Sequence, residues 1–259
     1  MVRFLVTDNK VTTMPEGPSL VILKESIRSF VGSKIVDVRG TSAKIARTDV
    51  VGKKIVDVKT WGKHLLLCLP DFTIRIHLLM FGSYRINEEK ENAVPKLQLF
   101  FSRKRSIAFY ACAIQRIDAP LDKVYDWEGD VMNVTWNNRK AIKKLKQLPD
   151  ALVCDALLDQ QIFSGVGNII KNEVLFRIRV HPLSKTGKLS SQKRRQLVQE
   201  AVRYSYQFLK WKQEGRLKKT WHAHTRKICP RDHHLIIKKY LGKSRRRSFY
   251  CKVCQTLYE

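Results

Sequence analysis

Acidic side chains are scarce in this sequence. It has 23 Asp and Glu against 50 Lys and Arg, which leaves a formal net charge of +27 over 259 residues. A compact chain with this excess of one sign repels itself, so the charge points to a polyanionic partner. Nucleic acid fits best, because every phosphate that a cation neutralises releases counterions and adds affinity.

Long apolar runs are absent too. The longest, such as Leu65–Leu69, have the length of a strand, whereas a membrane-spanning helix needs ~20 residues. The first thirteen residues, MVRFLVTDNKVTT, have no long apolar core of the kind found in a secretory signal. We therefore expect no membrane partner, and a cytoplasmic protein that associates with the nucleoid through DNA.

The sequence offers no framework of paired cysteines. Three cysteines stand alone in apolar surroundings and are expected to be reduced and buried: Cys68, Cys112 and Cys154. The other three gather near the C-terminus: Cys229, Cys251 and Cys254. Their spacing is typical of a metal site rather than of disulfides.

Apolar periodicity divides the chain into a strand-rich part and a helix-rich part, with boundaries near residues 130 and 225. One amphipathic helix over residues 19–30 precedes short, glycine-bounded segments that predict a β-sandwich or barrel. These segments cover residues 34–39, 54–59, 64–69, 73–78, 83–86, 97–101 and 107–110. Helices are expected at about 139–147, 151–160, 168–177 and 190–213, and a two-stranded, metal-held unit follows Cys229.

The C-terminal cysteines predict one structural zinc ion. Cys251 and Cys254 form a Cys-x-x-Cys knuckle, and Cys229 lies 22 residues upstream of it. Tetrahedral zinc needs a fourth ligand, which we expect from the segment after Cys229. His233 is the better ligand by type, and Asp232 is the alternative. The competing interpretation is a basic hairpin with three free thiols.

Two further segments suit contacts with phosphate. Residues 243–250 read KSRRRSFY, and guanidinium groups at the tip of a hairpin can hold phosphates, although such a run can also be a solvated turn. Gly165-Val-Gly167-Asn168 enters a predicted helix, where backbone amides favour an anion. Asn168 is either a further donor or an ordinary N-cap. The dinucleotide fingerprint G-x-G-x-x-G is missing, so we expect no nucleotide cofactor.

Four segments, in order, carry a specific resemblance. Residues 158–176, followed by Val180-His181-Pro182, resemble the helix–two-turn–helix signature of the formamidopyrimidine-DNA glycosylase/endonuclease VIII family. Met14–Pro18 resembles the catalytic N-terminus of that family, Trp61–Leu65 the segment with its functional lysine, and His77–Gly82 the loop that fills the gap left by an extruded base. The resemblance runs from Met14 to the C-terminus.

This resemblance implies an α+β fold in four parts. An extension covers residues 1–13, and an N-terminal helix with a two-layer β-sandwich forms a catalytic domain over 14–130. A helix–two-turn–helix domain covers 131–225, and a zinc-finger β-hairpin covers 226–259. The implied protein is a monomeric, bifunctional glycosylase and abasic-site lyase. It excises oxidised bases from damaged double-stranded DNA and cleaves by β,δ-elimination.

The resemblance also assigns roles to residues. The amine of Pro15 is the implied nucleophile, because an α-amino group titrates near ~8 and a lysine near ~10.4. Glu16 is the implied general acid and base, or else only a first-turn carboxylate that the helix dipole favours. Lys63 is implied to be catalytic, contacting phosphate near the lesion and assisting proton transfer, or else to be a solvated strand lysine. Met80 is the implied wedge, or else a core side chain. The residues implied to hold phosphates are His77, Asn168 and Arg246.

Four departures from the family pattern matter. Residues 1–13 precede Met14, and a proline inside a peptide bond has no amine, so we expect translation to start at Met14 and Pro15 to be exposed by methionine removal. Ser19 stands where a second glutamate is usual. Residues 109–114 lack the Arg-Arg-Phe-Gly wedge of the formamidopyrimidine branch, which favours the endonuclease VIII branch. Asp232 replaces a usual zinc cysteine.

Two other functions compete with this one. A non-catalytic protein of the same fold that binds damaged DNA would accommodate the extension and Ser19. A basic, zinc-containing RNA-binding or ribosome-associated protein would explain the charge and the cysteines. It leaves the Pro-Glu-Gly-Pro segment and the segment from Asp159-Gln160 to Gly167-Asn168 without a purpose.

Overall fold

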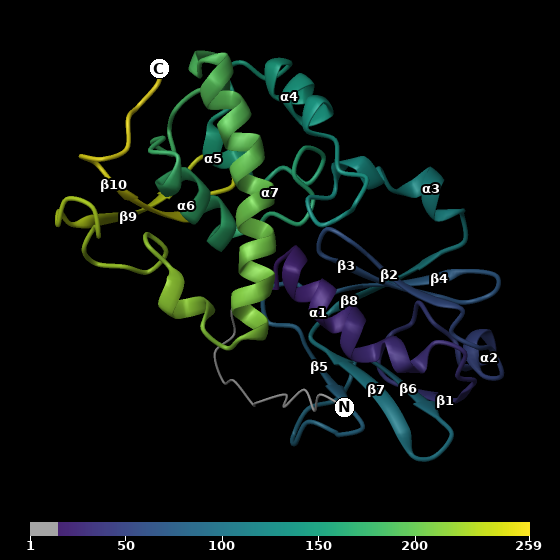
Figure 1. Ribbon diagram of the computed structural model, residues 1–259. Helices are drawn as coiled ribbons and strands as arrows, with labels where there is room; N and C mark the ends of the chain where they lie inside the picture. Colours follow the sequence, from purple (N-terminus) through teal and green to yellow (C-terminus); the bar gives the residue numbers. More distant parts are fainter. Residues whose placement is uncertain (1–14) are drawn as a thin grey trace.

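The computed structural model describes residues 15–259. It has one lobe of sheets and one lobe of helices, with a β-hairpin beside the helices (Figure 1). The expected extension over residues 1–13 and the proposed start at Met14 lie outside the described residues. None of the described helices combines the length and the apolar character that crossing a bilayer requires.

The first lobe begins with α1 (Gly17–Ile27) and contains two four-stranded antiparallel sheets. One sheet has the order β1-β6-β7-β5 and the other the order β2-β3-β4-β8. The strands are β1 (Ile35–Arg39), β2 (Asp57–Trp61), β3 (His64–Cys68), β4 (Thr73–His77), β5 (Ser83–Ile86), β6 (Leu97–Phe101), β7 (Arg105–Tyr110) and β8 (Ala113–Ile117). Short helices α2 (Arg47–Val50) and α3 (Leu121–Val124) lie in the connections.

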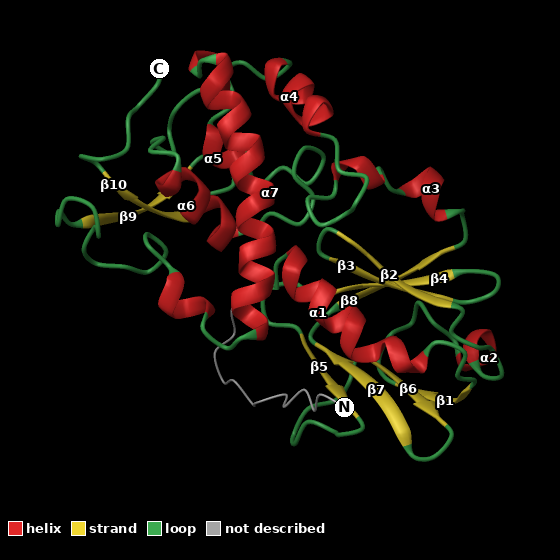
Figure 2. Cartoon of the chain, in the orientation of Figure 1, coloured by secondary structure: helices red, strands yellow, loops and turns green. Residues whose placement is uncertain are grey.

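One apolar core joins α1 to both sheets. Leu23 of α1, Leu65 of β3 and Ile107 of β7 are fully buried in the same cluster. Side chains alternate across a strand, so the neighbouring Leu66 faces the other side of its sheet, where it packs with Trp61 and Tyr125. The arrangement is the expected two-layer sandwich with a leading helix (Figure 2).

The strand predictions contain one omission and one shift. β8 was not predicted, because only two of its five residues, Ile114 and Ile117, are both apolar and buried. It is an edge strand of its sheet, which tolerates this composition. The strand expected at residues 54–59 begins at Asp57 and runs to Trp61.

The second lobe is built from α4 (Asn138–Lys146), α5 (Val153–Ala156), α6 (Asn168–Arg177) and α7 (Ser191–Gln213). Every residue of α6 from Asn168 to Phe176 is buried, because α7, α5 and the hairpin pack around it. The long α7 contacts both α6 and α1 and so joins the two lobes (Figure 1).

The helix expected at residues 151–160 is wrong beyond its first turn. α5 ends at Ala156, and the chain continues in tight turns. The Gln160 side chain supports these turns: its amide nitrogen donates to the carbonyls of Leu158 and Val166, and its oxygen accepts from the Gly165 amide. A side chain therefore satisfies backbone groups that a helix would otherwise pair.

The C-terminal hairpin consists of β9 (Ile236–Leu241) and β10 (Arg246–Cys251). β10 lies against α6, and Phe176 of α6 shares a small core with Phe249 and the buried thiols of Cys229 and Cys251. The expected α+β fold class, with a helical part and a two-stranded C-terminal unit, is confirmed.

Three glycines form the junction between the lobes. The Gly17 amide donates to the Gly165 carbonyl at 2.9 Å. Gly62 has φ +54°, and a Cβ there would lie 2.0 Å from the Ser164 hydroxyl oxygen. Gly165 itself has φ +96°. Three backbone segments thus approach more closely than side chains would allow.

We expect Gly62→Ala to lower the free energy of unfolding by about 2–5 kcal/mol, because left-handed strain and a steric clash add together. Gly215→Ala is the matched control, because Gly215 also has positive φ (+68°) but a Cβ there meets nothing within 4 Å. It should cost only about 1–2 kcal/mol. Urea unfolding measures both, and equal losses would show that close packing at the junction contributes nothing.

Candidate active site and metal centre

Glu16 lies at the amino end of α6. Its buried carboxylate accepts hydrogen bonds from the amides of Gly167 at 3.1 Å, Ile169 at 2.7 Å and Ile170 at 3.2 Å. Free amides and the helix dipole make this end of a helix a binding site for an anion. A Cβ on Gly167 would lie 2.4 Å from the Glu16 carboxyl carbon, so only glycine fits there. Pro15 directly precedes Glu16, so this contact brings Pro15 close to the amino end of α6.

Three of the expected site residues come within electrostatic reach of one another. Burial raises the pKa of Glu16, while the charge of Lys63 and the three helix amides lower it. Burial lowers the pKa of Lys63, with Glu16 opposing that shift and Arg246 adding to it. A carboxyl with a raised pKa beside an amine with a lowered pKa is suited to proton transfer.

Lys63 stands on the tight turn between β2 and β3, and Asp130 holds that turn. The buried Asp130 carboxylate accepts from the Gly62 amide at 2.9 Å and from the Met132 amide at 2.9 Å. Burial raises the pKa of Asp130 to about 6. No local sequence signal marks Asp130, because its partner Gly62 is 68 positions away in the chain.

His77 and Met80 lie at the end of β4 and in the loop that follows. The Nδ1 atom of His77 accepts from the Leu79 amide at 3.1 Å, so the ring is fixed to the loop. Burial lowers the pKa of His77, and the nearby charges of Lys63 and Arg75 lower it further. Met80 is exposed rather than part of the core.

α6 holds the backbone of β10 next to Arg246. The Arg247 carbonyl accepts from the side-chain nitrogens of Asn168 at 3.0 Å, Lys171 at 3.3 Å and Asn172 at 3.3 Å. The Lys171 amine also donates to the Ser248 hydroxyl at 2.8 Å. Asn168 is the first residue of α6, and its N-cap is Gly167, so the N-cap interpretation of Asn168 is wrong.

A second anchor holds the tip of the hairpin. The Asp155 carboxylate accepts from the amides of Lys243 at 2.8 Å and Ser244 at 3.1 Å. Arg246 is exposed and lies between this anchor and the α6 contacts. Positions i, i+3 and i+4 share one helix face. The spacing of Asn168, Lys171 and Asn172 could therefore have predicted from the sequence that these side chains bind a common partner.

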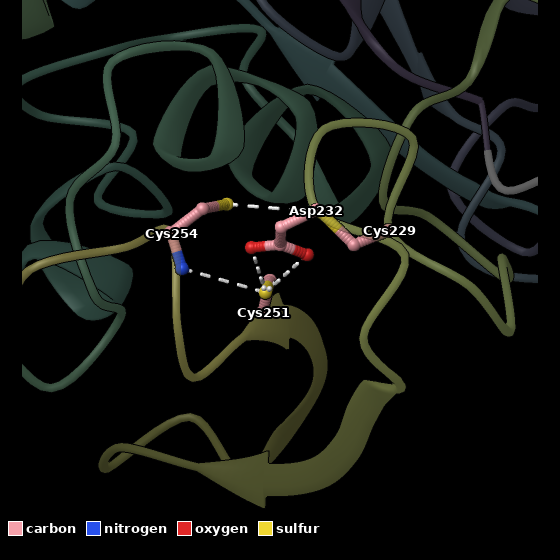
Figure 3. Close-up of side chains that lie close together, drawn as sticks. All are labelled: Cys229, Asp232, Cys251 and Cys254. Atoms are coloured by element: carbon pink, nitrogen blue, oxygen red, sulfur yellow. Dashed lines mark hydrogen bonds between the residues drawn. The ribbon is translucent and has the colours of Figure 1, made fainter.

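Four side chains near the C-terminus can hold a metal ion: Cys229, Asp232, Cys251 and Cys254 (Figure 3). Their ligand atoms all lie within 4.8 Å of one another. The sulfurs of Cys229 and Cys254 are 3.8 Å apart, and an Asp232 carboxylate oxygen is 3.2 Å from the Cys251 sulfur. Zinc–sulfur bonds of ~2.3 Å in a tetrahedron place two sulfurs ~3.8 Å apart, so the donor set fits zinc.

The expectation that His233 supplies the fourth ligand is corrected. His233 is exposed, has φ +60° and does not belong to the cluster. Asp232 follows Cys229 by three residues, as Cys254 follows Cys251, so the two knuckles have matching spacing. The matching spacing of the two knuckles identifies the fourth ligand correctly, whereas the preference of zinc for histidine over aspartate does not. Cys68, Cys112 and Cys154 are free and buried, as predicted.

Comparisons with known proteins agree with this geometry. Residues 14–112 match the formamidopyrimidine-DNA glycosylase N-terminal domain, and residues 132–215 match the formamidopyrimidine-DNA glycosylase H2TH domain. Endonuclease 8-like 2 from Bos taurus is 28% identical, covering 93% of this chain and 96% of that protein. Endonuclease 8-like 2 from Mus musculus is 33% identical, covering 70% of this chain and 57% of that protein.

Solved structures show the same fold. A viral DNA glycosylase superposes with a TM-score of 0.82 at 22% identity, covering 93% of this chain and 100% of its own. The formamidopyrimidine-DNA glycosylase of Lactococcus lactis, bound to DNA that contains an abasic site, gives a TM-score of 0.81 at 20% identity, covering 93% and 99%.

The fold and the similar proteins together identify the chain as a DNA glycosylase of the DNA-repair type. The chain belongs to the formamidopyrimidine-DNA glycosylase/endonuclease VIII family, and its curated relatives are of the endonuclease VIII branch.

The first prediction from the site concerns the metal ligands. We expect Asp232→Ala to weaken zinc binding at least about tenfold, and His233→Ala to leave it unchanged. Asp232→Cys should strengthen binding, because a thiolate is a softer ligand than a carboxylate. Competition with a chromogenic chelator measures the affinity. A loss in His233→Ala equal to that in Asp232→Ala would contradict the assignment.

The second prediction concerns Lys171. Burial lowers its pKa to about 8, against ~10.4 when exposed. Between these values the unfolded chain binds more protons than the folded chain, so the free energy of unfolding rises with pH. Relative to Lys171→Met, the wild-type protein should gain about 1–2 kcal/mol between roughly pH 7.5 and pH 9.5. Urea unfolding at both values measures this gain. A difference that does not change with pH would contradict the expected titration.

Proposed function

We propose that the protein is a monomeric, bifunctional glycosylase and abasic-site lyase that excises oxidised bases from double-stranded DNA. The observation that carries the proposal is the position of Glu16. Its carboxylate is held by three amides of α6, directly after Pro15 and within electrostatic reach of Lys63. The proposed nucleophile, proton donor and phosphate contact would thus act together at the junction of the two lobes.

The proposed reaction begins with the free secondary amine of Pro15. Its nitrogen attacks the sugar C1′, the C1′–N bond to the base breaks, and the base leaves with a proton. Glu16 protonates the ring oxygen as the ring opens, which leaves an iminium between Pro15 and C1′. Loss of a C2′ proton expels the 3′ phosphate, and a second elimination expels the 5′ phosphate. Water then hydrolyses the iminium and frees the amine.

The remaining site residues would hold DNA in the geometry that this reaction needs. A base in a duplex must rotate out of the stack before C1′ is accessible, at a cost of a few kcal/mol. We assign Met80 to the vacated space, and Lys63, His77 and Arg246 to the flanking phosphates. The Asn168 amide nitrogen contacts the Arg247 carbonyl, so Asn168 would act partly by orienting the hairpin.

Two findings support damaged DNA as the substrate class. The Lactococcus lactis relatives of the same fold were solved with DNA containing an abasic site and with DNA containing an oxidised pyrimidine. The likeness to endonuclease 8-like proteins supports the endonuclease VIII branch, and we therefore propose oxidised pyrimidines as the preferred lesions. A zinc ion held by Cys229, Asp232, Cys251 and Cys254 would have a structural role, since it would fix the hairpin that presents Arg246.

Ser19 favours the second candidate, a non-catalytic protein that binds damaged DNA. Its hydroxyl is buried and has no hydrogen-bond partner among residues 15–259, at the position where the family usually has a glutamate. A chain that retains residues 1–14 would also lack the free amine of Pro15. Such a protein would bind lesions without forming a covalent adduct.

A trapping experiment separates the two candidates. We expect a chain that begins at Pro15 to cross-link to abasic and oxidised-pyrimidine duplexes when sodium borohydride reduces the iminium. Pro15→Gly should trap less, and Glu16→Gln should slow base release about 10²-fold or more. The control is the chain with residues 1–14 retained, which should give no adduct. If the Pro15 chain binds lesion DNA but forms no adduct on any duplex, the binding protein replaces the enzyme.

A further inference from the structure

The turn at the tip of the C-terminal hairpin is bound to a carboxylate from another part of the chain. Residues 242–245 connect β9 to β10, and residues 236–252 contain seven Lys and Arg but no Asp or Glu. The Asp155 side chain supplies the carboxylate: Oδ2 accepts from the Lys243 amide at 2.8 Å and Oδ1 from the Ser244 amide at 3.1 Å. We call this contact of Asp155 with two successive amides the tip clasp.

The carboxylate has a rigid support. Asp155 belongs to α5, where the neighbouring Cys154 is 1% exposed in the core of the helical lobe. The Val153 amide donates to the Ser184 carbonyl at 2.9 Å, which ties α5 to the segment that follows α6. The backbone of Asp155 is therefore held in place by the lobe, and the tip clasp joins the hairpin turn to that lobe.

The turn is shaped to receive the carboxylate. Gly242 has φ +72°, and a Cβ there would lie 2.4 Å from an Asp155 carboxylate oxygen. The Arg245 amide closes the turn on the Gly242 carbonyl at 3.2 Å. The carboxylate thus occupies the space into which a side chain at position 242 would project, so the turn and Asp155 fit each other.

Arg246 lies between the tip clasp and the contacts of the hairpin with α6. It is the first residue of β10 and pairs with Leu241 across the hairpin. The α6 contacts begin one residue later, at the Arg247 carbonyl. The direction in which the chain enters β10 at Arg246 therefore depends on the turn that Asp155 holds.

We infer that Asp155 is a positioning residue for Arg246: it holds the turn so that the guanidinium is oriented towards a DNA phosphate before DNA binds. This inference rests on the proposed function, which assigns Arg246 to a phosphate. By charge alone, a carboxylate near DNA opposes binding. The tip clasp reverses this effect, because DNA no longer has to order the turn when it binds.

The experiment uses the full chain and a duplex with a tetrahydrofuran abasic analogue, whose binding needs no reaction at Pro15. Asp155→Asn keeps the size of the side chain but has one acceptor oxygen fewer, so it cannot bind both amides. It should bind the duplex about threefold to tenfold more weakly. The slope of log affinity against log salt concentration should become shallower by about 0.9, the value for one phosphate contact. Loss of the charge alone would instead strengthen binding.

Matched variants identify the source of the effect. Asp150→Asn removes the same charge from an exposed residue five positions away and should bind at least as tightly as the wild-type protein. Gly242→Ala opens the tip clasp from the hairpin side without a change in charge and should reproduce both losses. Arg246→Ala should show the same shallower slope. Adding Asp155→Asn to it should weaken binding less than twofold further, because changes that act through one contact are not additive.

Amide hydrogen exchange, followed by NMR, checks the tip clasp without DNA. The amides of Lys243 and Ser244 should exchange about tenfold faster in Asp155→Asn than in the wild-type protein. The amides of α6 should keep their protection, which shows that the helical lobe is still folded. Asp150→Asn should exchange like the wild-type protein throughout.

Three results would overturn the inference. The first is an Asp155→Asn protein that binds the abasic duplex as tightly as the wild-type protein, or more tightly. The second is a loss from Asp155→Asn that is equally large in the Arg246→Ala background, which would mean that Asp155 acts elsewhere. The third is unchanged exchange at Lys243 and Ser244. The proposed function fails separately, if the wild-type protein does not prefer the abasic duplex to an undamaged one.

Discussion

The arrangement depends on one buried carboxylate at a helix end. Removing Glu16 from water is costly unless its oxygens find donors, and the donors are amides at the start of α6 in the other lobe. The lobes must therefore dock for the site to form. Gly167 leaves room for the carboxylate, and Gly17, Gly62 and Gly165 let the surrounding backbones approach. The position of Glu16 consequently depends on the interface between the lobes.

The same helix organises the rest of the site. Its first turn binds Glu16, its middle holds β10 through Lys171 and Asn172, and Glu173 accepts from the amides of residues 222–224 that lead to the hairpin. Because Lys171, Asn172 and Glu173 bind other segments, α6 can be buried along most of its length. Glu16 and the β10 backbone next to Arg246 are both bound to α6, so the proposed proton donor and the proposed phosphate contact share one support.

Sequence alone predicted the parts of this structure that repeat locally. The periodicity and caps of α6 and α7 gave their bounds to within a residue, and strand alternation gave most of the sandwich. What failed depended on distant partners. The helix expected at residues 151–160 does not extend beyond Ala156, and Gln160 instead hydrogen-bonds to the turns that follow. Asp130 and Asp155 form hydrogen bonds with residues that are 68 and 88 positions away in the chain. The positions of the expected catalytic side chains relative to one another likewise became visible only with the fold.

The aspartate in the metal cluster is consistent with the charge of its surroundings. Three thiolates and one carboxylate around a divalent ion carry a net charge of about −2, as four thiolates would, whereas a histidine ligand would leave about −1. The hairpin around the cluster is strongly basic, with Lys238, Lys239, Lys243, Arg245, Arg246, Arg247 and Lys252. With zinc bound, an anionic centre at the base of the hairpin would offset part of their mutual repulsion. Asp232 would then keep the charge that a fourth cysteine gives, although it replaces a soft ligand with a harder one.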